Sequence, residues 1–239
     1  AIPACDVESS GQRFARPTTI AELLALLAEN PSAQIVAGAT EIGVELNKKL
    51  VSFPFLVSTE AITELRAIVK KDDAWEVGGA ATLTELEEAL AGEIPAIDKM
   101  LLVFASRQIR NRATLAGNLV TASPIGDMAP VLLALDATIT LASRAGERTM
   151  PLSDFFLAYR KTAMQKGEIV RRVTIPRRAS SNGGQSARRK VDSFKVSKRR
   201  ELDISIVAAC FAIDFDGAGR VVAARLAYGG VAATPARAK

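Results

Sequence analysis

Residues 110–130 of this 239-residue chain are RNRATLAGNLVTASPIGDMAP, a mid-chain stretch in which small polar residues alternate with apolar ones. The stretch is too polar for a buried strand and too apolar for a solvated linker. Its small or hydrogen-bonding residues are Thr114, Gly117, Asn118, Thr121, Ser123, Gly126 and Asp127. Glycines let a backbone approach a ligand closely, and exposed N–H groups with short hydroxyls can hold an anion. Composition therefore predicts a cofactor loop, and leaves open a long irregular connection packed under the domain.

The amino-acid composition excludes several kinds of chemistry. No apolar run approaches the roughly 18 residues that a membrane span requires, and the first residues do not resemble a signal peptide. The chain has no histidine, so His-based triads and His metal sites are excluded. Its two cysteines, Cys5 and Cys210, lack the spacing of a zinc or iron–sulfur site. We expect no metal site, no membrane association and a cytoplasmic location, where thiols stay reduced.

The net charge of +5 is concentrated in one segment. Residues 171–200 contain eleven Lys or Arg but only one acidic residue, Asp192. Nucleic-acid-binding segments interleave basic residues with aromatic ones, and here Phe194 is the only aromatic residue. We therefore expect no nucleic-acid partner.

Residues 17–60 predict a small parallel α/β lobe. A capping box formed by Thr19 and Glu22 opens a helix that stops at Asn30. Short buried strands are expected at 34–37 and 55–57, and a glycine loop over 38–43 follows the first of them. A loop at the C-terminal end of a parallel strand lies at the usual ligand edge of such a sheet. Residues 1–16 are expected to be irregular and to form a linker from an upstream region.

Residues 61–239 predict a larger lobe with antiparallel sheet and helices, which makes the whole chain an α+β protein. Hairpins are expected around residues 72–73 and 144–146, and the segment 177–190 is expected to be a mobile excursion. Helices are expected at 82–90, from residue 95 to about 104, at 130–135 and at 154–159, and later strands at 168–175, 193–196, 204–215 and 221–228. Asp127 would lie near the start of the 130–135 helix, where it would accept hydrogen bonds from hydroxyls rather than contact phosphate. Both glycine loops can face the seam between the lobes, although residue patterns alone do not show that they meet.

Four blocks together resemble the FAD-binding domain of the xanthine dehydrogenase and molybdenum hydroxylase family. They are VAGATEIG at 36–43, the stretch at 110–130, FFLAYRKT at 155–162 and FKVSKRRELDIS at 194–205. The blocks occur in the family's order, and the likeness covers nearly the whole chain from about Pro17. The last two are most similar to xanthine dehydrogenases, in particular the small subunit of the bacterial enzymes. The resemblance implies a fold of the vanillyl-alcohol-oxidase flavoprotein type, with FAD between the two lobes.

The resemblance also implies which residues contact FAD. They are Ala37, Gly38, Ala39, Thr40, Glu41 and Ile42 in the first loop, Thr114, Gly117, Asn118, Thr121 and Asp127 in the second, and Phe104, Ile169, Val170 and Lys195 elsewhere. Both loops would clasp the pyrophosphate, and Asp127 would hold polar groups of the ribityl or pyrophosphate segment. Thr121 would lie near the reactive nitrogen of the flavin ring, and Phe104 against the ring face. Glu41 would face the nicotinamide side, and Lys195 the end of the ring that becomes anionic on reduction. Glu41, Thr121 and Lys195 are thus the candidates for catalysis.

Several of these residues have an ordinary structural interpretation as well. Phe104, Ile169 and Val170 fit a hydrophobic core. Lys195 alternates with apolar neighbours and would normally be a solvated, outward residue, and Glu41 could simply place charge at a helix start. A separate pair, Arg199 and Arg200, could attract the phosphates of a dinucleotide or pair with nearby acids.

The family relationship implies an oxidoreductase component that is incomplete alone. In the family, the substrate is oxidised at a molybdenum centre, electrons cross two iron–sulfur clusters, and FAD hands a hydride to NAD. The expected activity is purine oxidation, of hypoxanthine or xanthine. Because this chain has no cysteines for clusters, the [2Fe-2S] domain is expected upstream or on another chain, and molybdopterin on a molybdenum-binding subunit. The family continues past the equivalent of Lys239 with a piece that covers part of the flavin site, which leaves FAD retention by this chain open.

Three alternatives stay open on the sequence. The first is a FAD module of a relative that acts on aldehydes, carbon monoxide or aromatic acyl thioesters. The second is a non-catalytic assembly module that uses residues 177–200 to dock an acidic partner. The third is a flavoenzyme acting alone on a small alcohol, and the absence of any histidine for a base or for flavin attachment disfavours it.

Overall fold

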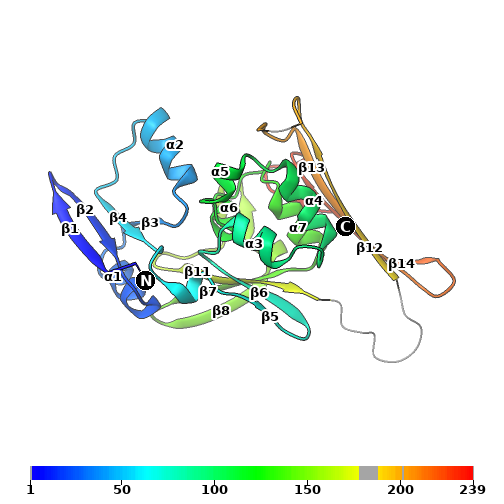
Figure 1. Cartoon of the computed structure of the whole chain (residues 1–239), viewed down its shortest axis with the longest axis horizontal. Helices are drawn as coiled ribbons and strands as arrows, with labels where there is room; N and C mark the ends of the chain where they lie inside the picture. Colours follow the sequence, from blue (N-terminus) through cyan, green and yellow to red (C-terminus); the bar gives the residue numbers. More distant parts are fainter. Residues whose placement is uncertain (1, 178–187, 201, 239) are drawn as a thin grey trace.

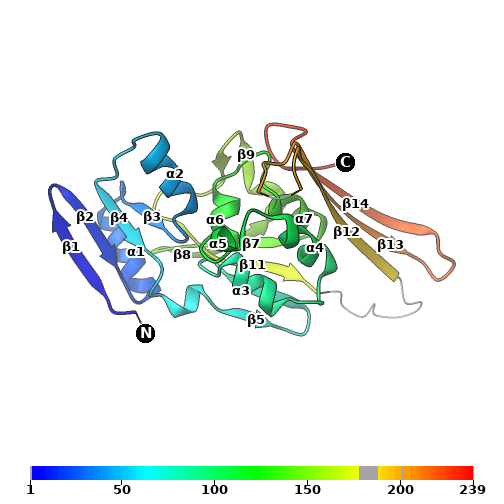
Figure 2. The same ribbon diagram turned by 45° about the horizontal axis from the view of Figure 1, so that its top comes forward.

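The computed structural model describes residues 2–177, 188–200 and 202–238. Three larger β-sheets follow one another along the long axis of the molecule, beside a small two-stranded one in the described residues, and a group of short helices packs between the second and third of the larger sheets (Figures 1 and 2). No helix in these residues is long and apolar enough to cross a membrane.

The first sheet, with its two helices, forms the small lobe at one end of the molecule (Figure 1). Its strands are β1 (Cys5–Ser9), β2 (Gln12–Arg16), β4 (Phe55–Ser58) and β3 (Gln34–Val36), in that order across the sheet. β4 runs parallel to both β2 and β3. Helix α1 (Ile20–Glu29) begins with the predicted Thr19 capping box, and buries Leu23 and Leu27 in the core of this lobe. Helix α2 (Thr40–Lys48) follows β3 and buries none of its side chains.

Two expectations for this region were wrong. Residues 5–16 are not irregular, because β1 and β2 form an antiparallel hairpin. Its turn is made by Ser10 and Gly11, both with positive φ (51° and 74°), as a tight two-residue hairpin requires. The expected glycine loop over 38–43 is also shorter, since α2 already begins at Thr40.

The second sheet has five antiparallel strands and supports most of the helices. In sheet order these strands are β5 (Ile68–Lys70), β6 (Ala74–Gly78), β11 (Ile169–Pro176), β7 (Thr138–Ser143) and β8 (Gly146–Pro151). The short 3₁₀ helix η1 (Thr63–Leu65) precedes them. The helices are α3 (Leu83–Ala89), α4 (Pro95–Val103), α5 (Arg107–Arg110), α6 (Leu115–Val120) and α7 (Met128–Ala134). All seven residues of α7 are buried, so this helix lies at the centre of the main hydrophobic core.

The helix expected at 154–159 was wrong. The segment instead forms the 3₁₀ helix η2 (Leu152–Asp154) and the small hairpin of β9 (Phe156–Ala158) and β10 (Lys161–Thr162). Phe155 and Phe156 are both buried, with ring centroids 5.4 Å apart in an edge-to-face arrangement. Burial of two adjacent aromatic rings outweighs the local preference for a helix.

The third sheet is formed by β12 (Arg188–Val196), β13 (Val207–Phe215), β14 (Val221–Gly229) and β15 (Ala236–Arg237). Most of the predicted excursion, residues 178–187, lies outside the described residues, whereas 188–190 belong to β12. The face toward α4 and α7 carries small side chains, namely Ser193, Ala208, Cys210, Ala212 and Ala227. The Ser193 hydroxyl donates to the Ala96 carbonyl of α4 at 2.7 Å. Small residues thus let the helices approach the sheet closely.

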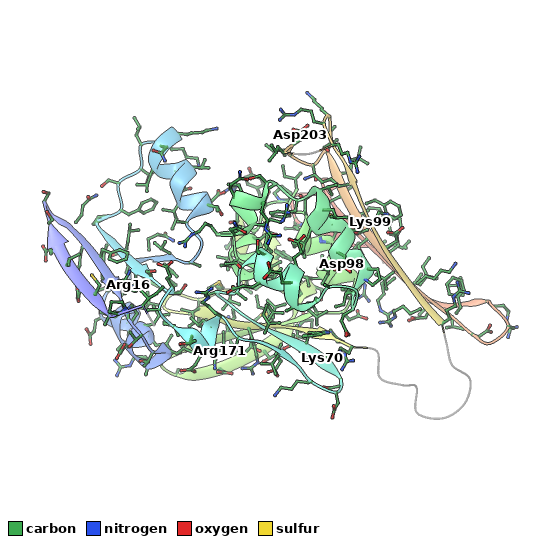
Figure 3. All side chains as sticks on the ribbon, viewed as in Figure 1. Arg16, Lys70, Asp98, Lys99, Arg171 and Asp203 are labelled. Atoms are coloured by element: carbon green, nitrogen blue, oxygen red, sulfur yellow. The ribbon has the colours of Figure 1, made fainter. Side chains whose placement is uncertain are left out.

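The opposite face of the third sheet carries the larger apolar residues. They include Phe194, Val196, Phe211, Ile213, Leu226 and Tyr228. The ring centroids of Phe194 and Phe211 are 5.5 Å apart, and those of Phe211 and Tyr228 are 5.6 Å apart. At the edge of this sheet, Lys99 of α4 bonds Asp192 at 2.7 Å and lies over the Phe194 ring (Figure 3).

Candidate functional site

The two glycine-containing segments meet in the structure. Gly38 packs directly on the backbone that precedes α6: a β-carbon at residue 38 would lie 1.9 Å from the Arg112 carbonyl oxygen and 3.0 Å from the Ala113 α-carbon. Only glycine permits this approach. The segment that leaves β3 and the stretch at 110–130 therefore form one site, which the sequence alone did not establish.

The start of α2 presents backbone N–H groups at this site. Ala39 occupies the N-cap position in the left-handed conformation (φ 62°), and no side chain of the described residues caps the helix. The first N–H groups of a helix have no partner within it, and together with the helix dipole they favour an anion. The nine-residue helix thus offers backbone donors within the segment 37–42, whose contact with the pyrophosphate stays a prediction.

Helix α6 is held by its own polar side chains. The Thr114 hydroxyl accepts a hydrogen bond from the Gly117 N–H at 3.0 Å, and caps the helix. The Thr121 hydroxyl donates to the Gly117 carbonyl, also at 3.0 Å. The Thr121 proton is therefore used internally, and its oxygen lone pairs stay available as acceptors.

Asn118 supplies the test of whether a flavin nucleotide fits. Its side-chain oxygen Oδ1 is buried and has no hydrogen-bond partner among the described residues. Gly126 lies beside it, since a β-carbon there would be 3.8 Å from that oxygen. A buried acceptor without a partner is unfavourable unless a ligand or water supplies the donor. Ribityl hydroxyls and the ring N–H of a flavin are such donors, so the residues fit FAD.

Asp127 and Lys195 form a buried ion pair, with Lys195 Nζ donating to Asp127 Oδ2 at 2.8 Å. Their side chains are only 9% and 4% exposed. The interpretation of Lys195 as a solvated, outward residue is therefore wrong, because its side chain lies on the inner face of the third sheet. The structure brings Lys195 to the N-terminus of α7, beside the stretch at 110–130.

Glu41 and Arg160 form an exposed ion pair of 2.8 Å that connects α2 to the turn between β9 and β10. Arg160 has a positive φ of 51°, which places it at the tip of this turn. Glu41 therefore does more than place a negative charge at a helix start, since it links the small lobe to a distant hairpin. The contact joins the first and third blocks of the family resemblance.

The other predicted contacts are core residues in this structure. Phe104 is 8% exposed, Ile169 3% and Val170 7%. Phe104 and Val170 belong to the main core, and Ile169 to the core of the small lobe. Their contribution to cofactor binding stays a prediction. Arg199 lies 3.8 Å from Asp203, so it pairs with an acid of its own loop.

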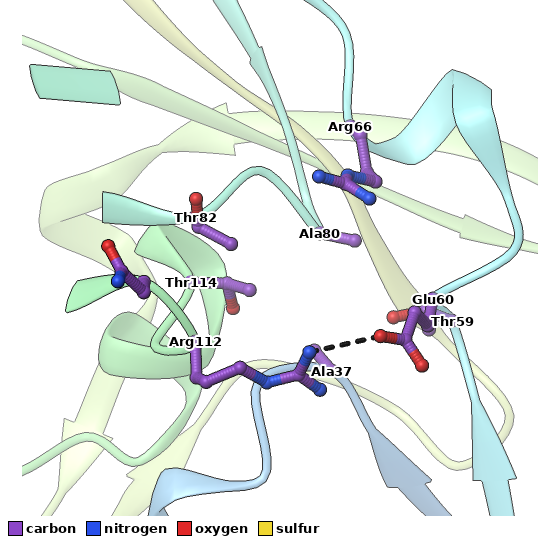
Figure 4. Close-up of a pocket in the computed structure, with 9 residues that line it drawn as sticks. Ala37, Thr59, Glu60, Arg66, Ala80, Thr82, Arg112 and Thr114 are labelled. Atoms are coloured by element: carbon purple, nitrogen blue, oxygen red, sulfur yellow. Dashed lines mark hydrogen bonds and ion pairs between the residues drawn. The ribbon is translucent and has the colours of Figure 1, made fainter. Parts of the chain in front are cut away.

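A small open pocket lies where the small lobe meets the helices (Figure 4). Its walls include Ala37 and Thr114, which are predicted site residues, and Arg112, which bonds Glu60 at 3.0 Å across the seam. Neither Arg112 nor Glu60 stands out as a site residue in the sequence, because the ion pair joins residues 52 positions apart. It is a second contact, besides Gly38, that ties the small lobe to the stretch at 110–130.

A parallel α/β lobe packed against a larger lobe, with a glycine loop and a helix start at their seam, defines a two-lobed FAD-binding domain. Residues 9–178 match the family model described as the FAD binding domain in molybdopterin dehydrogenase, and residues 192–239 match the CO dehydrogenase flavoprotein C-terminal domain. The chain belongs to the family of FAD-binding modules of molybdenum hydroxylases. The second match corresponds to the third sheet, and the predicted division near residue 60 stays a prediction.

Curated relatives support this assignment over nearly the whole chain. The chain is 38% identical over 232 residues to the xanthine dehydrogenase/oxidase of Gallus gallus, covering 92% of the chain and 17% of that protein. It is 36% identical over 241 residues to the nicotinate hydroxylase hnxS of Emericella nidulans, covering 93% of the chain and 18% of that protein. The chain therefore spans about a sixth of the length of these relatives.

Solved structures confirm the predicted fold class. Quinoline 2-oxidoreductase from Pseudomonas putida 86 superimposes with a TM-score of 0.82 at 30% identity, over 94% of this chain and 75% of that one. Reconstituted CO dehydrogenase from Oligotropha carboxidovorans gives a TM-score of 0.85 at 25% identity, over 97% of this chain and 78% of that one.

Proposed function

We propose that this chain is the flavin module of an NAD-linked xanthine dehydrogenase, which receives electrons from iron–sulfur clusters and delivers them to NAD. The observation that carries the proposal is the contact of Gly38 with Arg112, since it joins the two segments that would bind FAD. The 38% identity to a xanthine dehydrogenase/oxidase supports purine as the substrate class of the complete enzyme.

In this proposal, the chain's own groups bind and orient FAD at the seam. The N–H groups at the start of α2 and the Thr40 hydroxyl hold the pyrophosphate, with Thr114 and Gly117 ordering the facing helix. The Asn118 side-chain oxygen accepts a hydrogen bond from a hydroxyl or N–H of the nucleotide, which supplies the partner that this buried atom otherwise lacks among the described residues. The core positions of Phe104, Ile169 and Val170 shape the apolar surroundings.

Three residues act at the reacting end of the site. The Thr121 oxygen accepts a hydrogen bond near the flavin ring, and the Lys195 ammonium favours the negative charge that develops on reduction. The Glu41 carboxylate orients the nicotinamide side of NAD. When bound, FAD supplies the chemistry by which electrons that arrive singly leave as a hydride.

The proposed partners are the iron–sulfur and molybdenum-binding parts of the complete enzyme. Its two cysteines cannot hold two clusters, so a [2Fe-2S] domain and a molybdopterin-binding part must belong to the complete enzyme. Structures of CO dehydrogenase relatives share this fold of the flavin module. The two cysteines, Cys5 and Cys210, are free thiols, which supports a cytoplasmic enzyme because thiols stay reduced there.

The proposal is tested in the complete enzyme with Asn118→Leu. We expect loss of FAD and of NAD reduction, while xanthine oxidation continues with a dye that accepts electrons upstream of the flavin. Asn47→Leu is the matched control, because Asn47 lies on the exposed end of α2 and, within the described part of the chain, its side chain bonds only the Gly43 carbonyl of its own helix, at 2.8 Å. NAD reduction by Asn118→Leu at the wild-type rate would refute the site assignment.

A second candidate substrate class is supported by the relatives that act on nitrogen heteroaromatics. The nicotinate hydroxylase is nearly as similar (36%) as the xanthine dehydrogenase/oxidase (38%). Steady-state rates of the complete enzyme with hypoxanthine, xanthine, nicotinate and quinoline distinguish the two. A kcat/KM for nicotinate above that for xanthine would favour the second candidate.

A further inference from the structure

Both oxygens of the Asp127 carboxylate are already bound by the protein. Oδ2 accepts from Lys195 Nζ at 2.8 Å, and Oδ1 accepts from the Ser205 hydroxyl. Asp127 is 7% exposed and Ser205 4% exposed, so the arrangement is shielded from water. The three residues come from the N-terminus of α7, from β12 and from the segment that leads into β13.

Backbone contacts hold the same region in place. The Gly230 N–H donates to the Pro124 carbonyl at 2.7 Å. A β-carbon at Gly229 would lie 3.0 Å from that carbonyl oxygen, so the end of β14 packs tightly on residues 124–127. The third sheet therefore supports the segment between Thr121 and Asp127 from behind, and the carboxylate has little freedom to move as a whole.

Each Asp127 oxygen thus already accepts one hydrogen bond from the protein, whereas the Lys195 ammonium uses one of its donors among the described residues. An ammonium carries three donors, and Asp127 takes one of them. Lys195 therefore has the donors for a direct polar contact with the nucleotide, and Asp127 determines where the ammonium lies. A carboxylate bonded through one oxygen only can rotate, and a hydroxyl bond to its second oxygen prevents this.

We propose that Ser205 is a positioning residue for the flavin site: its hydroxyl orients Asp127, and Asp127 holds the Lys195 ammonium toward the flavin. The inference rests on the proposed function, in which Lys195 lies at the end of the ring that gains negative charge. Buried hydrogen bonds to a charged group are strong, because the surroundings screen them little.

Removal of the hydroxyl leaves Asp127 Oδ1 buried without a donor. The carboxylate then satisfies both oxygens by turning them toward Lys195, which draws the ammonium away from the ligand. A cation near the ring favours the reduced flavin, so its retreat makes the reduction potential more negative. The retreat of the ammonium also removes a polar contact with the flavin, which predicts FAD binding that is about tenfold weaker.

The test compares Ser205→Ala with Ser197→Ala in the complete enzyme. Ser197 lies in the same connection between β12 and β13, but among the described residues its hydroxyl donates only to the Arg199 carbonyl, at 2.6 Å in an exposed loop. Spectroelectrochemical titration at one fixed pH measures the flavin potential, and equilibrium dialysis measures the dissociation constant for FAD. We expect Ser205→Ala to shift both and Ser197→Ala to shift neither.

A double-mutant cycle separates positioning from a general structural effect. Lys195→Met removes the charge, and Ser205→Ala added to it should move the potential no further. The inference is overturned if Ser205→Ala shifts the flavin potential equally in the wild-type and Lys195→Met enzymes. It is also overturned if Ser205→Ala leaves the potential of the otherwise wild-type enzyme unchanged. A wild-type enzyme that binds no FAD would instead refute the proposed function itself, so the two failures are distinguishable.

Discussion

The carbonyl oxygen of Arg112 occupies the space that a β-carbon on residue 38 would need. The gap of 1.9 Å that such a carbon would leave is far below any van der Waals contact, and both partners are backbone. Neither side can relieve the overlap by changing a side-chain rotamer. The small lobe and the stretch at 110–130 can therefore pack this closely at this point only because residue 38 is glycine.

Gly38→Ala is expected to lower the free energy of unfolding by about 3 kcal/mol or more and to abolish FAD binding, since the two segments must separate. Gly43→Ala is the matched control. Gly43 lies within α2, with nothing within 4 Å of where its β-carbon would be. There alanine should stabilise the helix by roughly 0.5–1 kcal/mol. Urea unfolding measures the free energy of unfolding of each variant, and the flavin content measures FAD binding. If Gly38→Ala and Gly43→Ala gave the same values, the close contact at Gly38 would be contradicted.

Glu168→Gln is expected to destabilise the chain near neutral pH. Arg148 binds Glu168 at two points, with donor–acceptor distances of 2.6 Å and 2.8 Å, and the Gln165 N–H adds a third bond at 2.6 Å. The hydrogen bond from Arg148, followed by that from Gln165, lowers the pKa of Glu168 against the opposing effect of burial. Loss of charge-assisted bonds to a side chain that is 7% exposed should cost roughly 2 kcal/mol.

The pH dependence of this stabilisation has a definite sign. A carboxyl whose pKa is lower in the folded state contributes fully above its unfolded pKa of about 4.3, and the contribution is lost as pH falls through the folded value. Urea midpoints should therefore differ most between wild type and Glu168→Gln above about pH 5, and converge in acid. A difference that grows below pH 4 would contradict this assignment.

Arg160→Asn is expected to raise the KM for NAD of the complete enzyme several-fold with little change in stability. Asparagine tolerates the positive φ of 51° at this position, so the change removes charge without backbone strain. An exposed ion pair such as that with Glu41 contributes about 0–1 kcal/mol to stability. Its loss leaves the Glu41 charge uncompensated where a dinucleotide would approach. Arg144→Asn, in the exposed turn between β7 and β8, serves as the control. An unchanged KM for NAD in Arg160→Asn would argue against a role of Glu41 in binding NAD.

The two thiols are expected to react at very different rates. Burial raises the pKa of Cys210 to about 12, so its thiol stays protonated in the folded chain, whereas Cys5 is partly exposed in β1. Only a thiolate reacts readily with iodoacetamide. Peptide mass mapping after brief labelling should find Cys5 modified and Cys210 modified only in denaturant. Rapid labelling of Cys210 under native conditions would contradict its position on the inner face of the third sheet.

Local signals in the sequence were sufficient for several elements. Thr19 forms the predicted capping box, and Thr82 forms another at the start of the helix expected at 82–90, because the partners Glu22 and Glu85 are only three residues away. The hairpin at Ser10 was missed, since its turn residue is a serine with positive φ, which is uncommon outside glycine and asparagine.

The candidate site was predictable in its parts but not in its assembly. Lys195 was misjudged because its neighbours Phe194 and Val196 resemble core residues, whereas the face packed on the helices carries the small ones. Alternation along a strand predicts two faces, but not which of them is covered. Ser205 lay within a recognised block, yet its partner Asp127 is 78 residues away, and only the folded chain brings the two together.

Helix α7 also bears on how such modules can be inherited. Its seven residues lie in the region matched by the first family model, yet they share a single hydrophobic core with Ala208, Cys210 and Ala227 from the region matched by the second. The view in Figure 2 places α7 between the central sheet and the third sheet. If only one of the two matched regions were replaced by that of another protein, the shared hydrophobic core would be divided. Each part would then expose the apolar side chains that it contributes to that core. The two sequence modules must therefore be exchanged together, or evolve as a matched pair.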